Sequence, residues 1–169
     1  MEKRTFNKAI ETRADADGIL YIKGYAALYG VQTTIYESRG AIDEIIVQGA
    51  FSESDLSDVR LLFNHDANYI YGRTIPGTLV VGVDELGLFY EGYLSAENQS
   101  HRDLYDSVKR GDIDQSSFAF SFAPEGFAIE KTAAGQNNIR RITKIAKVYD
   151  VSPVTYPEYV STTVVARAE

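Results

Sequence analysis

Apolar runs rich in Val, Ile, Tyr, Phe and Thr recur along the chain, with glycine-containing polar segments between them. This pattern favours short β-strands joined by turns. The links at 84–87 (DELG) and 133–138 (AAGQNN) each combine Gly with acidic or amide residues, so we expect hairpin turns there. The runs predict strands at 18–29, 58–63, 78–83, 87–95, 116–123, 126–131 and 139–150.

Two segments follow a helical pattern instead. Residues 98–110 carry an apolar stripe, Ser100 is placed to cap the start, and Gly111 is a stop signal. A weaker helix of about two turns is expected at 49–58. Together, these strands and helices predict a mainly β protein with a few helices (α+β), built as a bent antiparallel sheet or a β-barrel with helices packed outside.

The 169 residues suit one domain, 1–169, and a composition that is 44% hydrophobic can supply a core. We expect 1–17 and 159–169 to be flexible ends.

Charge and composition exclude several classes of function. A net charge of −7 argues against nucleic acid as a partner, since phosphate backbones favour clustered Lys and Arg. No apolar run is long enough for a membrane span, and the charged N-terminus does not resemble a signal peptide. The absence of Cys removes disulfides, thiolate metal sites and a Cys nucleophile, and fits a protein of the cytoplasm.

The strand at 116–123 has two different faces. Its phenylalanines alternate with Ser117, Ala119 and Ser121, and period-2 geometry places each set on its own side. The Phe side is expected to enter the core together with Ser116. The side with small residues suits close approach by a ligand, so Ser117 is a better candidate nucleophile than Ser116. Ala119 and Ser121 could form the floor of a groove that binds a substrate peptide. Packing positions with limited space would give the same pattern.

Two further segments could complete a site. His65 ends an apolar strand, and an imidazole can activate a serine hydroxyl near neutral pH. Asp150 ends another strand and could hold the imidazole in one tautomer. Both residues also fit a purely structural role. His65 could be a polar residue at a strand–loop junction, and Asp150 could be an acid that begins a turn. His101, the other histidine, is expected on the surface.

Arg140 and Arg141 could help to bind an oxyanion, although a solvated strand face explains them equally. A metal hydrolase using His65 and Asp66 lacks any histidine-cluster spacing, so we expect no metal and no cofactor. The order His, Ser, Asp along the chain differs from the common serine hydrolase templates, and no G-x-S-x-G motif is present.

Six segments in order resemble one known family, the prohead proteases of tailed bacteriophages, which are capsid-maturation serine peptidases related in fold to the herpesvirus assemblins. The resemblance covers about 18–165. The segments are IKGYAALYG, DEIIVQGAF, VRLLFNHD with YGRT close behind, DELGL, VKRGDIDQSSFAFSF and VYDVSPVTYPEY.

The resemblance implies a serine endopeptidase with a herpesvirus-protease-like fold, His65 as general base and Ser117 as nucleophile. The third member is often Glu in the phage family, and the matching position here is Asp150. Such enzymes cut scaffold segments, the major capsid protein and themselves inside the immature capsid in the host cytoplasm, and a homodimer is compatible with the family. The alternative is a non-catalytic β-barrel that binds scaffold or capsid protein during virion assembly.

Overall fold

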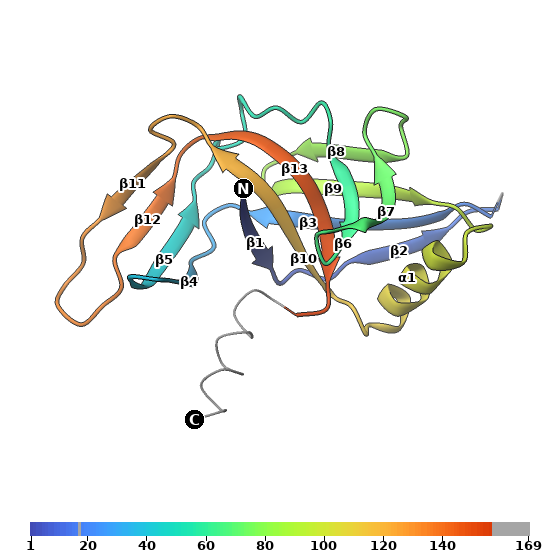
Figure 1. Ribbon diagram of the computed structural model, residues 1–169, viewed down its shortest axis with the longest axis horizontal. Coiled ribbons are helices and arrows are strands. Elements are labelled where there is room, and N and C mark those ends of the chain that lie inside the picture. Colours follow the sequence, from blue (N-terminus) through green and yellow to red (C-terminus); the bar gives the residue numbers. More distant parts are fainter. Residues whose placement is uncertain (17, 157–169) are drawn as a thin grey trace.

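The computed structural model describes residues 1–16 and 18–156, and its described part is mostly β (Figure 1). One helix, α1 (Gln99–Arg110), interrupts the strands. The strands are β1 (Glu2–Phe6), β2 (Glu11–Ala14), β3 (Leu20–Leu28), β4 (Thr33–Glu37), β5 (Gly40–Ile46), β6 (Arg60–Phe63), β7 (Asp66–Arg73), β8 (Leu79–Val83), β9 (Gly87–Leu94), β10 (Gln115–Phe122), β11 (Phe127–Glu130), β12 (Ile139–Ile142) and β13 (Ile145–Val154).

The strands form three sheets, ordered β1-β10-β13-β6-β7, β11-β12-β5-β4 and β2-β3-β9-β8. The prediction of a mainly β protein is therefore confirmed, but none of the three sheets closes into a barrel. Nor is the pairing purely antiparallel, because β13 runs parallel to β6 and β12 runs parallel to β5. One helix replaces the few that were predicted, and over the described residues no helix has the length and apolar character to cross a membrane.

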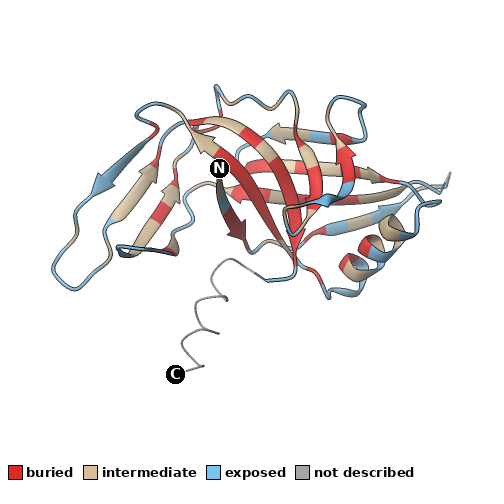
Figure 2. Ribbon diagram, in the orientation of Figure 1, coloured by how far each residue is buried: buried red, intermediate tan, exposed pale blue. Residues whose placement is uncertain are grey.

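The main core lies between the sheet of β10 and the sheet of β3 and β9, where most of the buried positions gather (Figure 2). Phe118 and Phe120 of β10 are fully buried and stack with ring centroids 4.7 Å apart. Ile22 of β3 and Tyr90 of β9 belong to the same cluster. Truncating a buried Phe to Ala costs about 3–5 kcal/mol, so β10 is held firmly from its Phe side.

Several predicted elements need correction. Residues 49–58 form turns and not a helix, and the buried Phe51 packs on Phe118 from there. The predicted strand 139–150 is two strands in different sheets. Within the segment 1–17, which was expected to be a flexible end, residues 2–6 form β1 and residues 11–14 form β2, and Arg4, Thr5 and Phe6 of β1 are buried. Residues 159–169 lie outside the described residues.

The helix forms as its pattern predicts, although its cap differs. Asn98, and not Ser100, is the N-cap, and its side chain accepts a hydrogen bond from the Ser100 backbone N–H. Gly111 ends the helix in the left-handed region at φ 82°, which glycine adopts at little cost.

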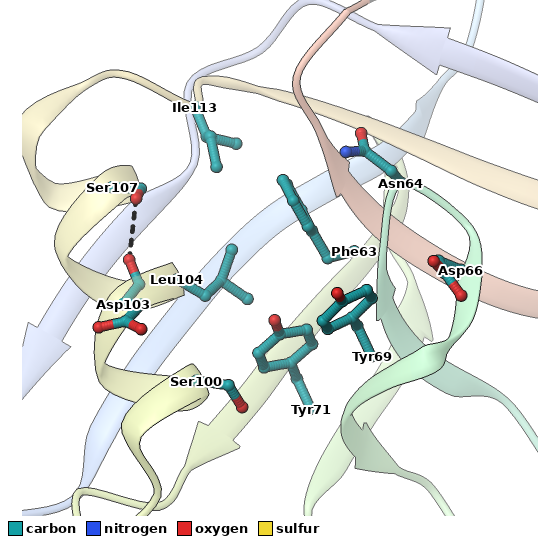
Figure 3. Close-up of a pocket in the computed structure, with 10 residues that line it drawn as sticks. All are labelled: Phe63, Asn64, Asp66, Tyr69, Tyr71, Ser100, Asp103, Leu104, Ser107 and Ile113. Atoms are coloured by element: carbon teal, nitrogen blue, oxygen red, sulfur yellow. Dashed lines mark hydrogen bonds between the residues drawn. The ribbon is translucent and has the colours of Figure 1, made fainter.

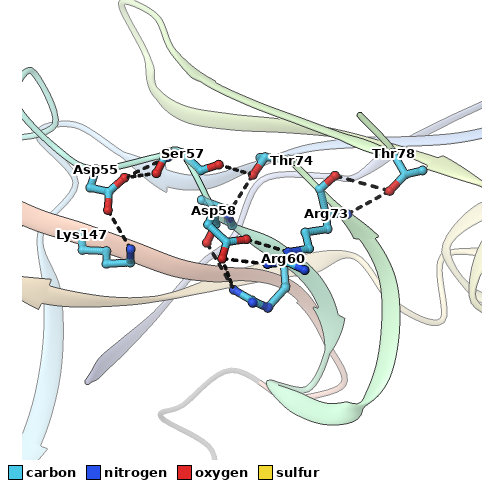
Figure 4. Close-up of polar contacts among 9 residues, drawn as sticks. Asp55, Ser57, Asp58, Arg60, Arg73, Thr74, Thr78 and Lys147 are labelled. Atoms are coloured by element: carbon cyan, nitrogen blue, oxygen red, sulfur yellow. Dashed lines mark hydrogen bonds and ion pairs between the residues drawn. The ribbon is translucent and has the colours of Figure 1, made fainter. Parts of the chain in front are cut away.

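An exposed polar network surrounds the start of β6 (Figure 4). Arg73 of β7 donates two hydrogen bonds to Asp58, at 2.7 and 2.9 Å, and its guanidinium lowers the pKa of the Asp58 carboxyl. Lys147 of β13 donates to Asp55 at 2.7 Å. These contacts fix the segment before β6 against β7 and β13, the strands between which β6 lies.

Candidate active site

The two adjacent serines of β10 point to opposite sides of their sheet. Ser116 is fully buried and its Oγ lies 2.8 Å from the hydroxyl of Tyr90, on the core side. Ser117 faces the other way and pairs across the strands with Thr5 of β1 and Ser152 of β13. The alternation along β10 therefore places Ser116 on the core side and Ser117, which is itself only 1% exposed, on the opposite face of the sheet.

His65 is placed by a tight turn. Asn64 and His65 are the two residues between β6 and β7, and both have positive φ, 53° and 58°. Two consecutive residues with positive φ are what a two-residue hairpin of type I′ requires. Residues other than glycine are uncommon in that region, although Asn and His enter it more readily than most, and such conformations cluster at functional sites.

Hydrogen bonds hold this turn against the end of β13. The Asn64 N–H donates to the carbonyl of Pro153 at 3.1 Å. The Asn64 side chain accepts from the Thr155 N–H at 2.9 Å and donates to the Thr155 hydroxyl at 3.1 Å. The His65 N–H donates to Ser152 Oγ at 3.3 Å. The imidazole is thus fixed by its own backbone as well as by its ring contacts.

A continuous hydrogen-bonded chain joins the three predicted residues. His65 Nδ1 lies 2.6 Å from Asp150 Oδ1, and His65 Nε2 lies 2.6 Å from Ser117 Oγ. Ser152 Oγ donates to Asp150 Oδ1 at 2.9 Å. The His65 and Asp150 side chains are each 8% exposed, so the chain of groups is largely shielded from water.

The chemistry of these groups determines which atom donates and which accepts in each hydrogen bond. An ionised carboxylate only accepts, so His65 Nδ1 donates to Asp150 and leaves Nε2 as the acceptor for the Ser117 hydroxyl. In that tautomer the imidazole can remove the hydroxyl proton as the oxygen attacks an electrophile. The carboxylate then lies beside the imidazolium that forms.

A cleft of about 140 Å³ reaches Ser117 and His65. Lys3 and Thr5 of β1 line one part of it, and Val154, the last residue of β13, lines another together with Tyr156. Its lining is Lys3, Thr5, Asn64, His65, Ser117, Val154 and Tyr156.

The structure does not bring the other predicted site residues into this cleft. Ala119 is fully buried between β1 and β13, and Ser121 is partly buried, with its Oγ accepting a 3.4 Å bond from the Tyr149 hydroxyl. Neither residue is among those that line the cleft at Ser117.

The two arginines are engaged in a different sheet. Arg140 donates to Glu37 and Glu44 at 2.8 and 2.7 Å, and Arg141 donates to Glu130 at 2.8 Å. Their strand β12 pairs with β5 on one side and β11 on the other, so its main-chain groups are also occupied. Among the described contacts none links either arginine to the serine or the imidazole, and the structure gives no support to an oxyanion role.

His101 was expected on the surface and is half-buried. Its Nδ1 accepts from the Ser95 N–H at 3.0 Å, its ring lies 5.1 Å from that of Tyr71, and burial lowers its pKa. His101 is not part of the hydrogen-bonded chain that joins Asp150, His65 and Ser117.

Two residues that position the imidazole, Ser152 and Asn64, were not among the predicted site residues. Ser152 could have been found by period 2, since it shares a strand face with Asp150. Asn64 could have been found as a residue that tolerates the left-handed region next to a turn.

A hydrogen-bonded Ser-His-Asp arrangement is one that serine hydrolases on unrelated folds share. Comparison with protein families shows to which family of proteins the chain belongs. The family model of the caudovirus prohead serine proteases matches residues 8–169. The chain belongs to that family, and it is a capsid maturation protease.

The fold agrees with this assignment. The structure of the bacteriophage T4 capsid assembly protease, gp21, is similar to this chain with a TM-score of 0.50 and 11% sequence identity, covering 92% of this chain and 97% of that one. At this identity the likeness concerns the fold alone. None of the curated protein sequences matches the chain.

Proposed function

We propose that this protein is a serine endopeptidase in which Ser117 is the nucleophile, His65 the general base and Asp150 the group that orients the base. The observation that carries the proposal is the hydrogen-bonded chain from Asp150 through His65 to Ser117, with 2.6 Å at both imidazole nitrogens. These distances are within the range that proton transfer requires.

The reaction follows from that geometry. Ser117 Oγ attacks the scissile carbonyl carbon while His65 Nε2 takes the hydroxyl proton. The C–N bond then breaks, and His65 returns the proton to the leaving amine. Water attacks the resulting ester with His65 again as base, which releases the acid product and restores Ser117. Asp150 stabilises the imidazolium in both halves and does not itself become protonated.

We further propose that the substrates are scaffold segments, the major capsid protein and the enzyme itself, cut within the immature capsid in the host cell. Family membership supports this choice. The relation to herpesvirus proteases and the homodimer are separate predictions that the same family resemblance suggests.

The test is to incubate the protein with the scaffold and capsid proteins of the same phage and to identify new termini by mass spectrometry. We expect a few defined cuts with the unchanged enzyme and none with Ser117→Ala, whose fold is checked by circular dichroism. Unchanged cutting by Ser117→Ala would refute the assignment of the nucleophile. Binding to these proteins with no cut by the unchanged enzyme would favour the non-catalytic assembly module.

A further inference from the structure

A larger pocket lies beside the cleft, between α1 and the hairpin of β6 and β7 (Figure 3). Its volume is about 370 Å³. Asn64 and Asp66, the two residues that flank His65, both line it, and Asn64 also lines the cleft at Ser117. The two spaces therefore share a wall, and a peptide held at Ser117 could place a nearby side chain in the larger pocket.

The inner wall of this pocket is apolar and aromatic. Phe63, Tyr71 and Leu104 face a common space in Figure 3, with Tyr69 and Ile113 at its sides. Such a wall suits the methylene stem of a long side chain and can also attract a cation over a ring face.

The charge in the pocket has one sign. Asp66 on the hairpin and Asp103 on α1 lie on opposite sides, and the ten lining residues include no Lys, Arg or His. Asp66 accepts hydrogen bonds from Asn68, and Asp103 accepts one from Gln99, but within the described residues neither forms an ion pair. An acidic side chain would be repelled here, and a positive one would meet two carboxylates without a basic partner.

From these contacts we infer that the pocket is a specificity subsite that binds a Lys or Arg side chain of the substrate within a few residues of the cut. The inference rests on the proposed endopeptidase function and adds the recognition of the substrate. The protein's net charge of −7 acts in the same direction, because it favours the approach of basic peptides. A basic side chain matches both the apolar stem space and the acidic sides, whereas a purely apolar one would leave the carboxylates unused.

The test uses peptides that span a mapped cut site. We expect a Lys or Arg to recur at one position near the cuts, and its replacement by norleucine to lower kcat/KM about tenfold, which is the scale of one lost charge interaction. Replacement by Glu should lower kcat/KM further.

Charge reversal in the enzyme supplies the matched experiment. Asp103→Lys should abolish the preference for the basic peptide over the norleucine peptide and improve cleavage of the Glu peptide. Asp106→Lys makes the same change of charge one turn along α1 at a residue outside the pocket, and it should keep the wild-type preference. Asp103→Asn and Asp106→Asn repeat the comparison with less demand on helix stability.

The outcomes separate the two proposals. Cleavage with no basic preference at any position, or equal effects of the substitutions at 103 and 106, would overturn the subsite while leaving the endopeptidase intact. A preference for an apolar side chain, with no effect of charge on cleavage, would overturn the proposed subsite as well. Absence of cleavage by the wild-type protein would overturn both.

Discussion

Asp150→Asn tests how much the carboxylate contributes to catalysis. Asp150 Oδ1 accepts from His65 Nδ1 at 2.6 Å and from Ser152 Oγ at 2.9 Å, in a place where its side chain is 8% exposed. Asparagine keeps the shape but removes the charge, and its amide can present a donor to the imidazole, which favours the wrong tautomer.

The size of the loss follows from the charges. Two unit charges about 4 Å apart attract by about 4 kcal/mol at an effective dielectric constant of about 20. Because about 1.4 kcal/mol is a factor of ten in rate, losing the stabilised imidazolium should lower kcat/KM about 1,000-fold. The change should appear mainly in kcat, since Asp150 does not line the cleft.

The assay is steady-state cleavage of a peptide that spans a mapped cut site. Ser152→Ala is the control, because it removes one donor to Asp150 but keeps the carboxylate, and we expect a loss of about tenfold or less. If folded Asp150→Asn cleaved within tenfold of the wild-type rate, Asp150 would not be the orienting group.

Three further predictions concern neighbouring groups. Ser116→Ala should lower the free energy of unfolding in urea by about 1–3 kcal/mol, since it leaves the buried Tyr90 hydroxyl without its partner, while kcat/KM stays unchanged; a large loss of activity would contradict the roles given to the two serines. Asn64→Ala should reduce kcat/KM and lower the free energy of unfolding by about 1–2 kcal/mol, because alanine tolerates a φ of 53° poorly and cannot make the bonds to the end of β13; unchanged activity would show that the turn does not position the imidazole. Arg73 lowers the pKa of folded Asp58, so its carboxylate contributes stability above its unfolded pKa and loses it as pH falls through the folded value; the difference in Tm between wild type and Asp58→Asn should exist at neutral pH and disappear in acid, and a constant difference would refute this coupling.

The sequence was informative about Ser117 because large and small residues alternate simply along its strand. Asp150, in contrast, was expected to end a strand and lies in the interior of β13. Ser117 was separated from Ser116 by alternation alone, and the structure places Ser116 against the core as expected. With only two histidines in the chain, few candidates existed for the base. The convergence of His65, Ser117 and Asp150 could not be derived from spacing, because it depends on the parallel pairing of β6 with β13.

The strands β1, β2, β4, β5 and β7 were not predicted, and two of them, β1 and β5, were missed for the same physical reason. β1 and β5 carry charged residues that are buried, namely Arg4 and Glu44, which form an ion pair extended by Arg140. In a sequence, a charged residue inside a strand is taken to face solvent unless its ion-pair partner is known. Arg4, Glu44 and Arg140 are far apart along the chain, so their pairing could not be predicted.

The wrong helix at 49–58 shows another limit of local patterns. A short helix of about two turns was expected there, but Gly49 adopts φ 85° and the backbone turns repeatedly. Ala50 and Phe51 are buried through contacts with the core, so tertiary packing overrides the local preference.

Whether His65 activates Ser117 is tested most directly by covalent labelling of the active enzyme with a fluorophosphonate, followed by intact-mass measurement and peptide mapping. We predict one adduct per chain, on Ser117, with loss of cleavage in proportion to labelling and no adduct in His65→Ala. An adduct on Ser116, or a fully cleaving enzyme that takes up no label, would contradict the assignment of Ser117 as the nucleophile activated by His65.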